Sequence, residues 1–306
     1  MQLKAGDYGM KQNASIRQVI EVLSEGRTVS YKVTVPEGLT SYQIVEKLKA
    51  DANLSGEIAS VPPEGSLLPD TFMVDRGMQR QAILDRMQAQ ARRVAEKAWA
   101  QRKKDLPLKS LEEAIVLASI VEKETGRADE RERVAAVFVN RLKANMRLQS
   151  DPTILYGLSG GKTVWNRAIL RSEIAQKTAH NTYQIDGLPP TPICNPGRAA
   201  IEAVLNPANT KELFFVADGN GRHVFAETAK EHIANVQKWR AAERDMRAKA
   251  AAALAGDDTP TTAAQPPAEP KKPKAPVARP APPKKTKEAT PAEAAKELPW
   301  APKSKP

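Results

Sequence analysis

Two glutamates at the end of an apolar run are the residues of this chain whose types and spacing could do chemistry. The apolar run AIVLASIV overlaps the stretch ASIVEKET, residues 118–125, and stops at Glu122, Lys123 and Glu124. On a helix, residues two positions apart lie ~200° apart around the axis, so Glu122 and Glu124 do not face each other. They therefore cannot be the two carboxylates that flank one bond in ordinary glycosidases.

A single carboxyl group at this position can still act as a general acid. Glu124 follows Leu117 and Ile120 on one helical face, and an apolar environment raises the pKa of a carboxyl group by desolvation. A raised pKa suits proton donation near neutral pH. The alternative is that these charges only mark the point where the helix meets water, and spacing alone leaves both possibilities open.

Short polar side chains gather downstream of the two glutamates. The segments NRLKANMRLQSDPTILYGL, HNTYQIDGLPP and ICNPG are rich in such groups and in fixed turns. Groups of this kind can hydrogen-bond a polyhydroxylated ligand, and tight loops can hold them rigid. Together with a candidate acid, they indicate a sugar site. The first of these segments contributes Arg141, Gln149, Ser150, Asp151 and Thr153.

The composition argues against several other classes of site. The chain has 306 residues and one cysteine, Cys194, so an intramolecular disulfide is excluded. The three histidines lack ligand spacing, and we expect neither a metal site nor a cofactor. Cys194 is interpreted as a small buried hydrophobic residue and not as a nucleophile. No run approaches the ~18 apolar residues of a membrane-spanning helix.

The net charge of +11 is unevenly placed along the chain. Residues 251–306 contain 10 Lys and Arg against six Asp and Glu, with 13 of the 24 prolines. This composition predicts a disordered, extended tail, either a solvated linker or a segment that binds polyanions. Because much of the basic excess lies there, and because no RNP motif or zinc finger is present, we expect no nucleic-acid partner.

Periodicity and capping signals place the chemistry on an α+β framework. Capping boxes open at Ser15, Thr40 and Ser110, each followed three residues later by Gln or Glu. VSYKVTV alternates like a half-buried strand, and ELFFVAD is a short strand with which HVF can pair. The prolines and glycines of residues 60–77 predict a loop. Further helices are expected at about 77–104, from Asp129, at 197–205 and at 227–250.

The order of these motifs resembles a known family. LASIVEKETG, VAAVFVNRL, MRLQSDPTILYGL, NTY, GLPP and ELFFVADG follow one another as in the YceG-like (MltG-type) endolytic murein transglycosylases. EGSLLPDTF resembles a segment that precedes their catalytic core. The resemblance implies a small, partial LysM-like β-α module at residues 1–60, a mostly helical catalytic domain with a short β-sheet at 61–250, and the disordered tail at 251–306.

The resemblance also implies a reaction and assigns roles. These enzymes cleave the β-1,4 bond between N-acetylmuramic acid and N-acetylglucosamine in nascent peptidoglycan strands and leave 1,6-anhydro ends, which terminates strand elongation. One carboxyl group serves as acid and then as base, so divergent glutamates suffice. By motif position Glu124 is catalytic, and Glu122 supports it through a neighbouring arginine or the backbone. The expected cleft residues are Gln149, Ser150, Asp151, Thr153, Asn181, Tyr183, Glu64 and Asp70, with Arg141 either there or a structural partner of an acidic side chain.

Location and partners are implied by the resemblance alone. Family members begin with a membrane-spanning helix, whereas this chain opens at LKAG, partway into the LysM-like region. We therefore expect attachment to the bacterial inner membrane through an N-terminal helix absent from this sequence, with the described domains in the periplasm. Peptidoglycan glycan strands and peptidoglycan synthases are the expected partners. The alternative, a non-catalytic peptidoglycan-binding or scaffold protein of the same fold, predicts loss of Glu124 or of QSDPT, and both are present.

Overall fold

Helices and small antiparallel or parallel strand pairs make up this protein. The computed structural model describes residues 6–26, 28–165 and 167–255, and the mixture of elements within them confirms the α+β class. The tail expected at 251–306 lies, from residue 256 on, outside the described residues. In chain order the elements are α1 (Ile16–Glu25), β1 (Ser30–Thr34), α2 (Ser41–Ala50), β2 (Leu54–Ser55), β3 (Thr71–Asp75), β4 (Met78–Gln79), α3 (Arg80–Ala100), α4 (Leu111–Glu124), α5 (Arg131–Lys143), α6 (Asp151–Ser159), α7 (Arg171–Ala175), α8 (Arg198–Leu205), β5 (Phe214–Ala217), β6 (His223–Ala226) and α9 (Ala229–Ala255).

A small unit forms around the pair of strands β1 and β3, which run antiparallel with Val33 opposite Phe72. Helix α2 packs Ile44 and Leu48 into the same apolar cluster. The predicted Thr40–Gln43 capping box begins α2, with both of its hydrogen bonds present. Strand β3 corrects the prediction of a loop throughout 60–77: its short alternating pattern follows the last proline of that segment and pairs with β1 across the boundary expected at residue 60.

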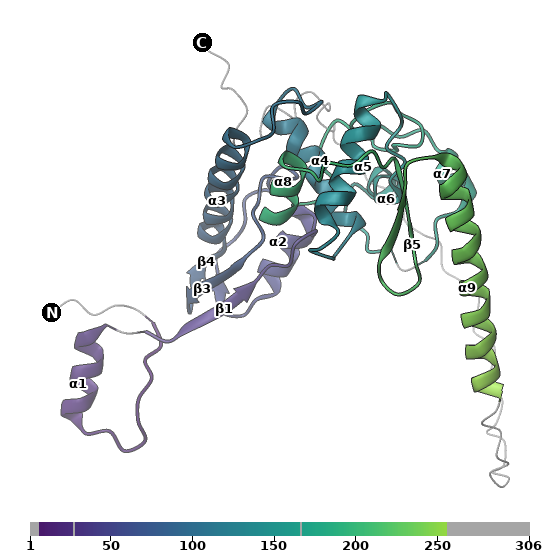
Figure 1. Cartoon of the computed structure of the whole chain (residues 1–306). Helices are drawn as coiled ribbons and strands as arrows, with labels where there is room; N and C mark the ends of the chain where they lie inside the picture. Colours follow the sequence, from purple (N-terminus) through teal and green to yellow (C-terminus); the bar gives the residue numbers. More distant parts are fainter. Residues whose placement is uncertain (1–5, 27, 166, 256–306) are drawn as a thin grey trace, which may run out of the picture.

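Helix α3 joins this small unit to a larger helical core. Ile83 and Met87 in its first half belong to the cluster under β1 and β3. Val94 and Ala98 in its second half belong to a separate cluster built around α4, α5 and α8. The two cores therefore share one continuous helix, which couples their positions (Figure 1).

Helix α4 is the centre of the larger core. Every residue from Ala114 to Val121 is buried, as expected of a helix that is apolar on all sides. Its neighbours are α3, α5, α6 and α8. The last turn, from Glu122, leaves the core, so the abrupt change from apolar to charged residues marks the point where this end of α4 reaches the surface.

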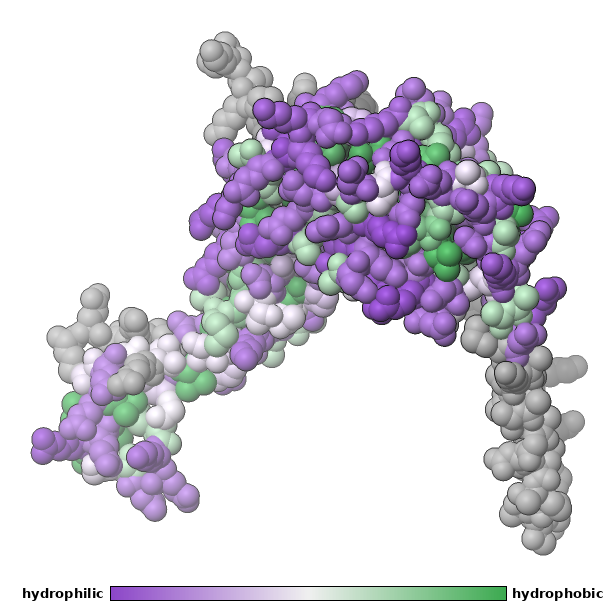
Figure 2. Space-filling model, in the orientation of Figure 1, coloured by the Kyte–Doolittle hydropathy of each residue, from purple (hydrophilic) through white to green (hydrophobic). Residues whose placement is uncertain are grey.

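Helix α1 differs from the sequence-based expectation of a compact pair of β-α units. The predicted Ser15–Gln18 capping box is present, but no residue of α1 is buried, and Ile16 is 81% exposed. Figure 1 shows α1 apart from the body of the molecule, and Figure 2 shows apolar surface on it. The apolar stripe predicted for this helix is therefore real but does not contact the core.

The hairpin of β5 and β6 was predicted and is confirmed. The strands pair antiparallel with Phe215 opposite Phe225. Phe215 lies edge-on to Phe138 of α5, with ring centroids 5.8 Å apart. Helix α9 packs against the hairpin and extends from the body (Figure 1). The contact between Phe215 and Phe138 holds the hairpin against α5.

Candidate active site at the end of α4

Glu124 is the last residue of α4, and the structure brings it to the QSDPT segment. Its Oε1 accepts a hydrogen bond from Ser150 Oγ at 2.6 Å. Ser150 is buried and directly precedes α6. The contact joins two segments 26 residues apart. It fixes the orientation of one carboxyl group at the point where the central helix meets solvent.

Burial raises the pKa of the Glu124 carboxyl group to about 7. The hydrogen bond from Ser150 lowers this pKa, the negative charge of Asp151 raises it, and the charges of His223 and Arg141 lower it. Desolvation is the largest of these effects. The C-terminal end of α4 also carries the negative end of the helix dipole, which disfavours a carboxylate there. Near neutral pH the group is therefore present in both protonation states, as a residue that both donates and accepts a proton requires.

A buried network of hydroxyl groups holds Ser150 in place. The amide of Ser150 donates to Thr182 Oγ1 at 2.9 Å, and Thr153 Oγ1 donates to the Ser150 carbonyl oxygen at 2.6 Å. The two threonine hydroxyls lie 2.9 Å apart. Thr153 therefore positions Ser150 and does not itself face solvent. Thr182 was not singled out from the sequence, although it lies within the NTY motif between two residues that were.

Gln149 and Arg141 shape the chain just before Ser150. Gln149 has a φ of 51°, in the left-handed region that costs a residue with a side chain about 1 kcal/mol, and its side chain is exposed. Arg141 is buried and donates to the carbonyl oxygens of Leu148 and Leu213, each at 2.7 Å. Its partners are thus backbone carbonyls and not the acidic side chain that the sequence left open. Burial lowers the pKa of its guanidinium group.

Asp151 and Tyr183 form a second polar pair beside Glu124. Tyr183 donates its hydroxyl to Asp151 Oδ1 at 2.7 Å, and burial together with this contact raises the Tyr183 pKa. Asp151 is exposed at the start of α6. Asn181, in contrast, is buried, and its amide donates to the carbonyl oxygens of Ile174 and Gln176. Asn181 therefore shapes the loop that carries Tyr183.

Glu122 points to a different neighbour from Glu124. Its Oε2 accepts a hydrogen bond at 2.9 Å from the amide of Gly197, directly before α8. Of the two partners expected for it, arginine or backbone, the structure shows the backbone. Burial raises the pKa of Glu122, while the Gly197 contact lowers it. Glu122 thus anchors α8 to α4.

Glu64 lies between the two cores. Its Oε1 accepts from the Ser41 amide at 2.8 Å and from Asn195 Nδ2 at 3.0 Å, and its Oε2 accepts from the Tyr156 hydroxyl at 3.3 Å. Burial raises its pKa to about 7. The carboxyl group of Asp70, in contrast, is exposed and accepts a bond from the amide of the next residue, Thr71. No contact described for Asp70 joins it to the cluster around Glu124.

Comparison with known proteins identifies the family. The profile of the YceG-like family matches residues 1–238. This chain belongs to the YceG-like family. It is similar to the endolytic murein transglycosylase of Bacillus subtilis, with 30% identity over 268 residues that cover 77% of this chain and 73% of the relative.

A second relative and a crystal structure agree with this family. The endolytic murein transglycosylase of Streptococcus pneumoniae strain D39 is 30% identical over 282 residues, covering 76% of this chain and 50% of the relative. The chain thus spans about half the length of that protein. A crystal structure of a YceG-like protein from Listeria monocytogenes superposes with a TM-score of 0.55 at 28% identity, covering 75% of this chain and 84% of that one.

One pair in this YceG-like protein was not predicted from the sequence. His223 Nδ1 lies 2.8 Å from Glu130 Oε2, and the His223 amide donates to Glu130 Oε1 at 3.1 Å. The pair ties β6 to the residue before α5. The only sequence signal was a histidine in the segment GNGRHVF, which the capping and periodicity rules do not use.

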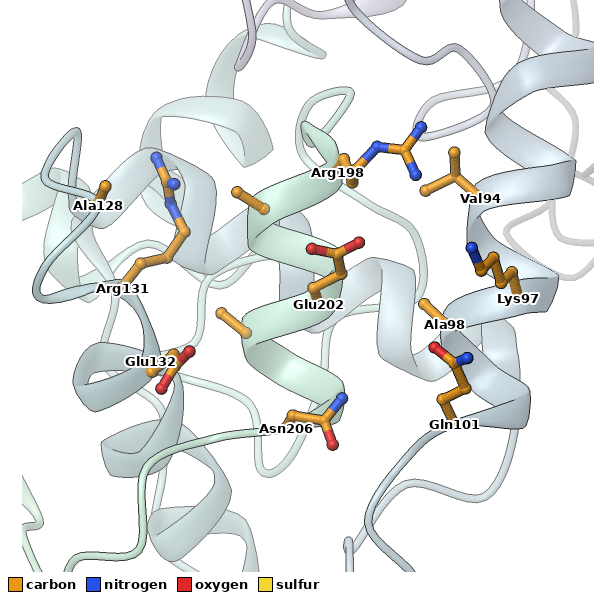
Figure 3. Close-up of a pocket in the computed structure, with 12 residues that line it drawn as sticks. Val94, Lys97, Ala98, Gln101, Ala128, Arg131, Glu132, Arg198, Glu202 and Asn206 are labelled. Carbon is orange, nitrogen blue, oxygen red and sulfur yellow. The ribbon is translucent and has the colours of Figure 1, made fainter.

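A separate hollow of this YceG-like protein does not include Glu124 among its lining residues. It measures about 390 Å³ and lies over α8, between α3 and α5 (Figure 3). Its walls include Lys97, Arg131, Arg198 and Glu202, and Ser150 is not among its lining residues. We place the candidate site at Glu124 because a carboxyl group with a raised pKa can donate and accept a proton there. The volume of a hollow does not by itself indicate a reaction. Within the described part of the chain, no group of three or more His, Cys, Asp or Glu could hold a metal ion.

Proposed function

We propose that this chain is an endolytic murein transglycosylase that cuts within peptidoglycan glycan strands. Two relatives at 30% identity carry that name. The observation that carries the proposal is the Glu124 carboxyl group, whose pKa is raised to about 7 and whose orientation is held by Ser150. A single group that is near half-protonation at neutral pH suits a reaction in which acid and base are the same residue.

The proposed reaction breaks the β-1,4 bond between N-acetylmuramic acid and N-acetylglucosamine. Protonated Glu124 donates its proton to the bridging oxygen as the bond from that oxygen to the anomeric carbon breaks. The resulting carboxylate then accepts the proton of the muramyl C6 hydroxyl, and that oxygen bonds to the anomeric carbon. The product ends in a 1,6-anhydro ring, Glu124 regains its proton, and no water is consumed.

The other site residues have distinct roles in this proposal. Ser150 orients the Glu124 carboxyl group, and Thr153 and Thr182 hold Ser150. Tyr183 presents its hydroxyl group and Asp151 its carboxylate oxygens beside Glu124, where both can hydrogen-bond sugar hydroxyls. Gln149, Glu64 and Asp70 stay proposed cleft residues, and Glu122 and Arg141 act through the backbone segments that they hold.

The finer features implied by family resemblance are also proposals. The β1–α2–β3 unit supports a LysM-like glycan-binding module, since α2 lies between two antiparallel strands in the chain and packs against them. Termination of nascent strands, contact with peptidoglycan synthases, attachment to the inner membrane and a periplasmic location rest on the resemblance alone. Among the described helices, none combines the length and apolar character needed to cross a membrane.

The test is mass spectrometry of isolated glycan strands incubated with this chain and with its Glu124→Gln variant. Internal cuts with anhydro-muramyl ends, absent in the variant, are the expected result. Loss of general acid–base help should lower turnover by a factor of ~10²–10⁴ with the fold unchanged. Reducing ends would mean hydrolysis and would point to Asp151 as a second carboxylate. Binding without cleavage would favour the non-catalytic scaffold.

A further inference from the structure

A hollow of about 200 Å³ lies beside the Glu124 site and is not used by the reaction as proposed. It is smaller than the ~300–1,000 Å³ of sites that enclose a drug-sized ligand, so it suits one sugar-sized group. Its walls come from both cores and from the segment after α6. They are Thr40, Gln43, Lys123, Pro152, Leu155, Tyr156, Ser159, Gly161, Thr163, Val164, Trp165 and Ile193.

The hollow is adjacent to the residues that position Glu124. Pro152 lies in the first turn of α6, directly after the Ser150–Asp151 pair, and one helical turn spans only ~5.4 Å. Lys123 precedes Glu124 at the end of α4, and its ammonium group donates to the Gly38 carbonyl oxygen at 3.3 Å. A strand bound at Glu124 therefore needs to extend only a short distance to reach this hollow.

The start of the segment that carries Trp165 is held against α2 and α6. Thr40 Oγ1 donates to the Gly161 carbonyl oxygen at 2.7 Å. Gly161 has a φ of 74°, and a Cβ there would lie 2.7 Å from Thr40 Cγ2 and 2.9 Å from the Tyr156 ring. The glycine is thus required for this close approach. Further along, the Arg167 guanidinium group lies 4.7 Å from the Trp165 ring centroid and orients the indole.

Trp165 supplies an unused hydrogen-bond donor. Its Nε1–H is buried and has no acceptor among the described residues. A buried donor without a partner costs free energy, and a ligand acceptor recovers that cost when a rotation of the indole turns the N–H into the hollow. An indole ring with one free N–H also matches a sugar ring, which has an apolar C–H face and polar edges.

The lining favours a neutral ligand. Apolar surface from Leu155, Ile193 and Val164 alternates with hydroxyl and amide groups, and Lys123 is the one charged lining residue. A peptide rich in carboxylates would find few cationic partners there. An acetamido group, in contrast, offers both a carbonyl acceptor for an indole N–H and a methyl group for an apolar wall.

We propose that this hollow binds one N-acetylated hexosamine ring of the glycan strand, away from the bond that is cut, with Trp165 as its contact residue. This subsite rests on the proposed transglycosylase function for its substrate class. Such a subsite would favour cuts within strands, since a sugar must occupy the subsite as well as the position beside Glu124.

The test measures the affinity of the full chain for peptide-free glycan strands, in the Glu124→Gln background so that cleavage does not interfere. Adding Trp165→Ala should raise Kd about tenfold or more, because both the ring contact and the hydrogen bond are lost. Trp165→Phe keeps an aromatic ring and loses the donor, so it should raise Kd about two- to tenfold. Trp239→Ala on α9 is the matched control and should leave Kd unchanged.

Each outcome decides a separate question. Unchanged Kd in both Trp165 variants overturns the subsite, even if the unmodified chain cuts strands to anhydro ends. A loss confined to strands that carry stem peptides assigns the hollow to peptide and also overturns it. Weakened binding together with absent cleavage by the unmodified chain supports the subsite and rejects the proposed function. Thermal unfolding checks the fold, and the phenylalanine variant decides if the alanine variant does not fold.

Discussion

Replacing Ser150 with alanine should extend glycan cleavage to higher pH. The Ser150 hydroxyl donates to Glu124 at 2.6 Å and stabilises the ionised carboxylate. Hydrogen bonds to charged groups contribute ~1.5–3 kcal/mol, and one pKa unit corresponds to ~1.4 kcal/mol. Losing the bond should therefore raise the Glu124 pKa from about 7 by ~1–2 units.

The sign follows from the order of proton transfers. Glu124 must begin protonated, so the rate falls as pH rises through its pKa. Because the variant keeps its proton to higher pH, the alkaline limb of its profile should move up by the same ~1–2 units, while the maximal rate falls through looser orientation of the carboxyl group.

Two measurements check this result. The pH dependence of kcat/KM reports the pKa of the free enzyme, and a carbon NMR titration of glutamate carboxyl groups, with Glu124→Gln to assign the signal, reports it without turnover. Ser24→Ala on α1 is the control, since its hydroxyl donates to the Glu21 carbonyl oxygen at 2.7 Å, within a helix that does not contact the site. A limb that stays in place or moves down would refute the assignment of Ser150 as the donor that favours ionisation.

Three further perturbations test the structure around Glu124. The Glu124 pKa is about 7 in the folded chain and 4.5 when the group is exposed. The folded state is therefore most stable below pH 4.5, where the carboxyl group is protonated in both states, and it loses this stability as pH rises through 7. Glu124→Gln should raise the free energy of unfolding by up to about 3 kcal/mol at pH 8 and leave it unchanged at pH 4, measured by urea denaturation. Arg141→Lys should lower stability by ~1–3 kcal/mol and kcat more than KM, because one ammonium group cannot reach both Leu148 and Leu213 as the guanidinium does; equal kinetics would contradict this. Glu64→Ala should cost ~2–4 kcal/mol in thermal unfolding because it leaves buried donors unpaired, and Glu64→Gln should cost less; equal losses would show that the acceptor oxygens are unimportant.

Local signals were reliable predictors of the elements. The capping boxes at Ser15 and Thr40 are present in full. At Ser110 the serine hydroxyl accepts from the Glu113 amide, but the Glu113 carboxylate accepts from the Lys109 amide, so that box is only half formed. Such signals depend on residues within one turn, which is why they can be recognised before any tertiary contact is known.

Predictions that depended on tertiary packing were less successful. The stripe on α1 correctly indicated a helix, but an amphipathic pattern does not say whether a partner covers it, and Ile16 is exposed. Strand β3 was missed because Phe72 and Val74 alternate over too few residues, directly after a proline-rich loop. Its pairing with β1 is a long-range contact that no local pattern encodes.

By itself, the sequence predicted that α4 is a helix that ends in charge, since a continuous apolar run is expected in the core and Glu122 ends that run. It also determined, through helix geometry, that Glu122 and Glu124 diverge. Only the tertiary structure decided what each carboxylate meets: the Gly197 amide for one and the Ser150 hydroxyl for the other. Desolvation and hydrogen bonding set a pKa through atoms within a few ångströms, and those atoms come from segments 75 and 26 residues away in the chain.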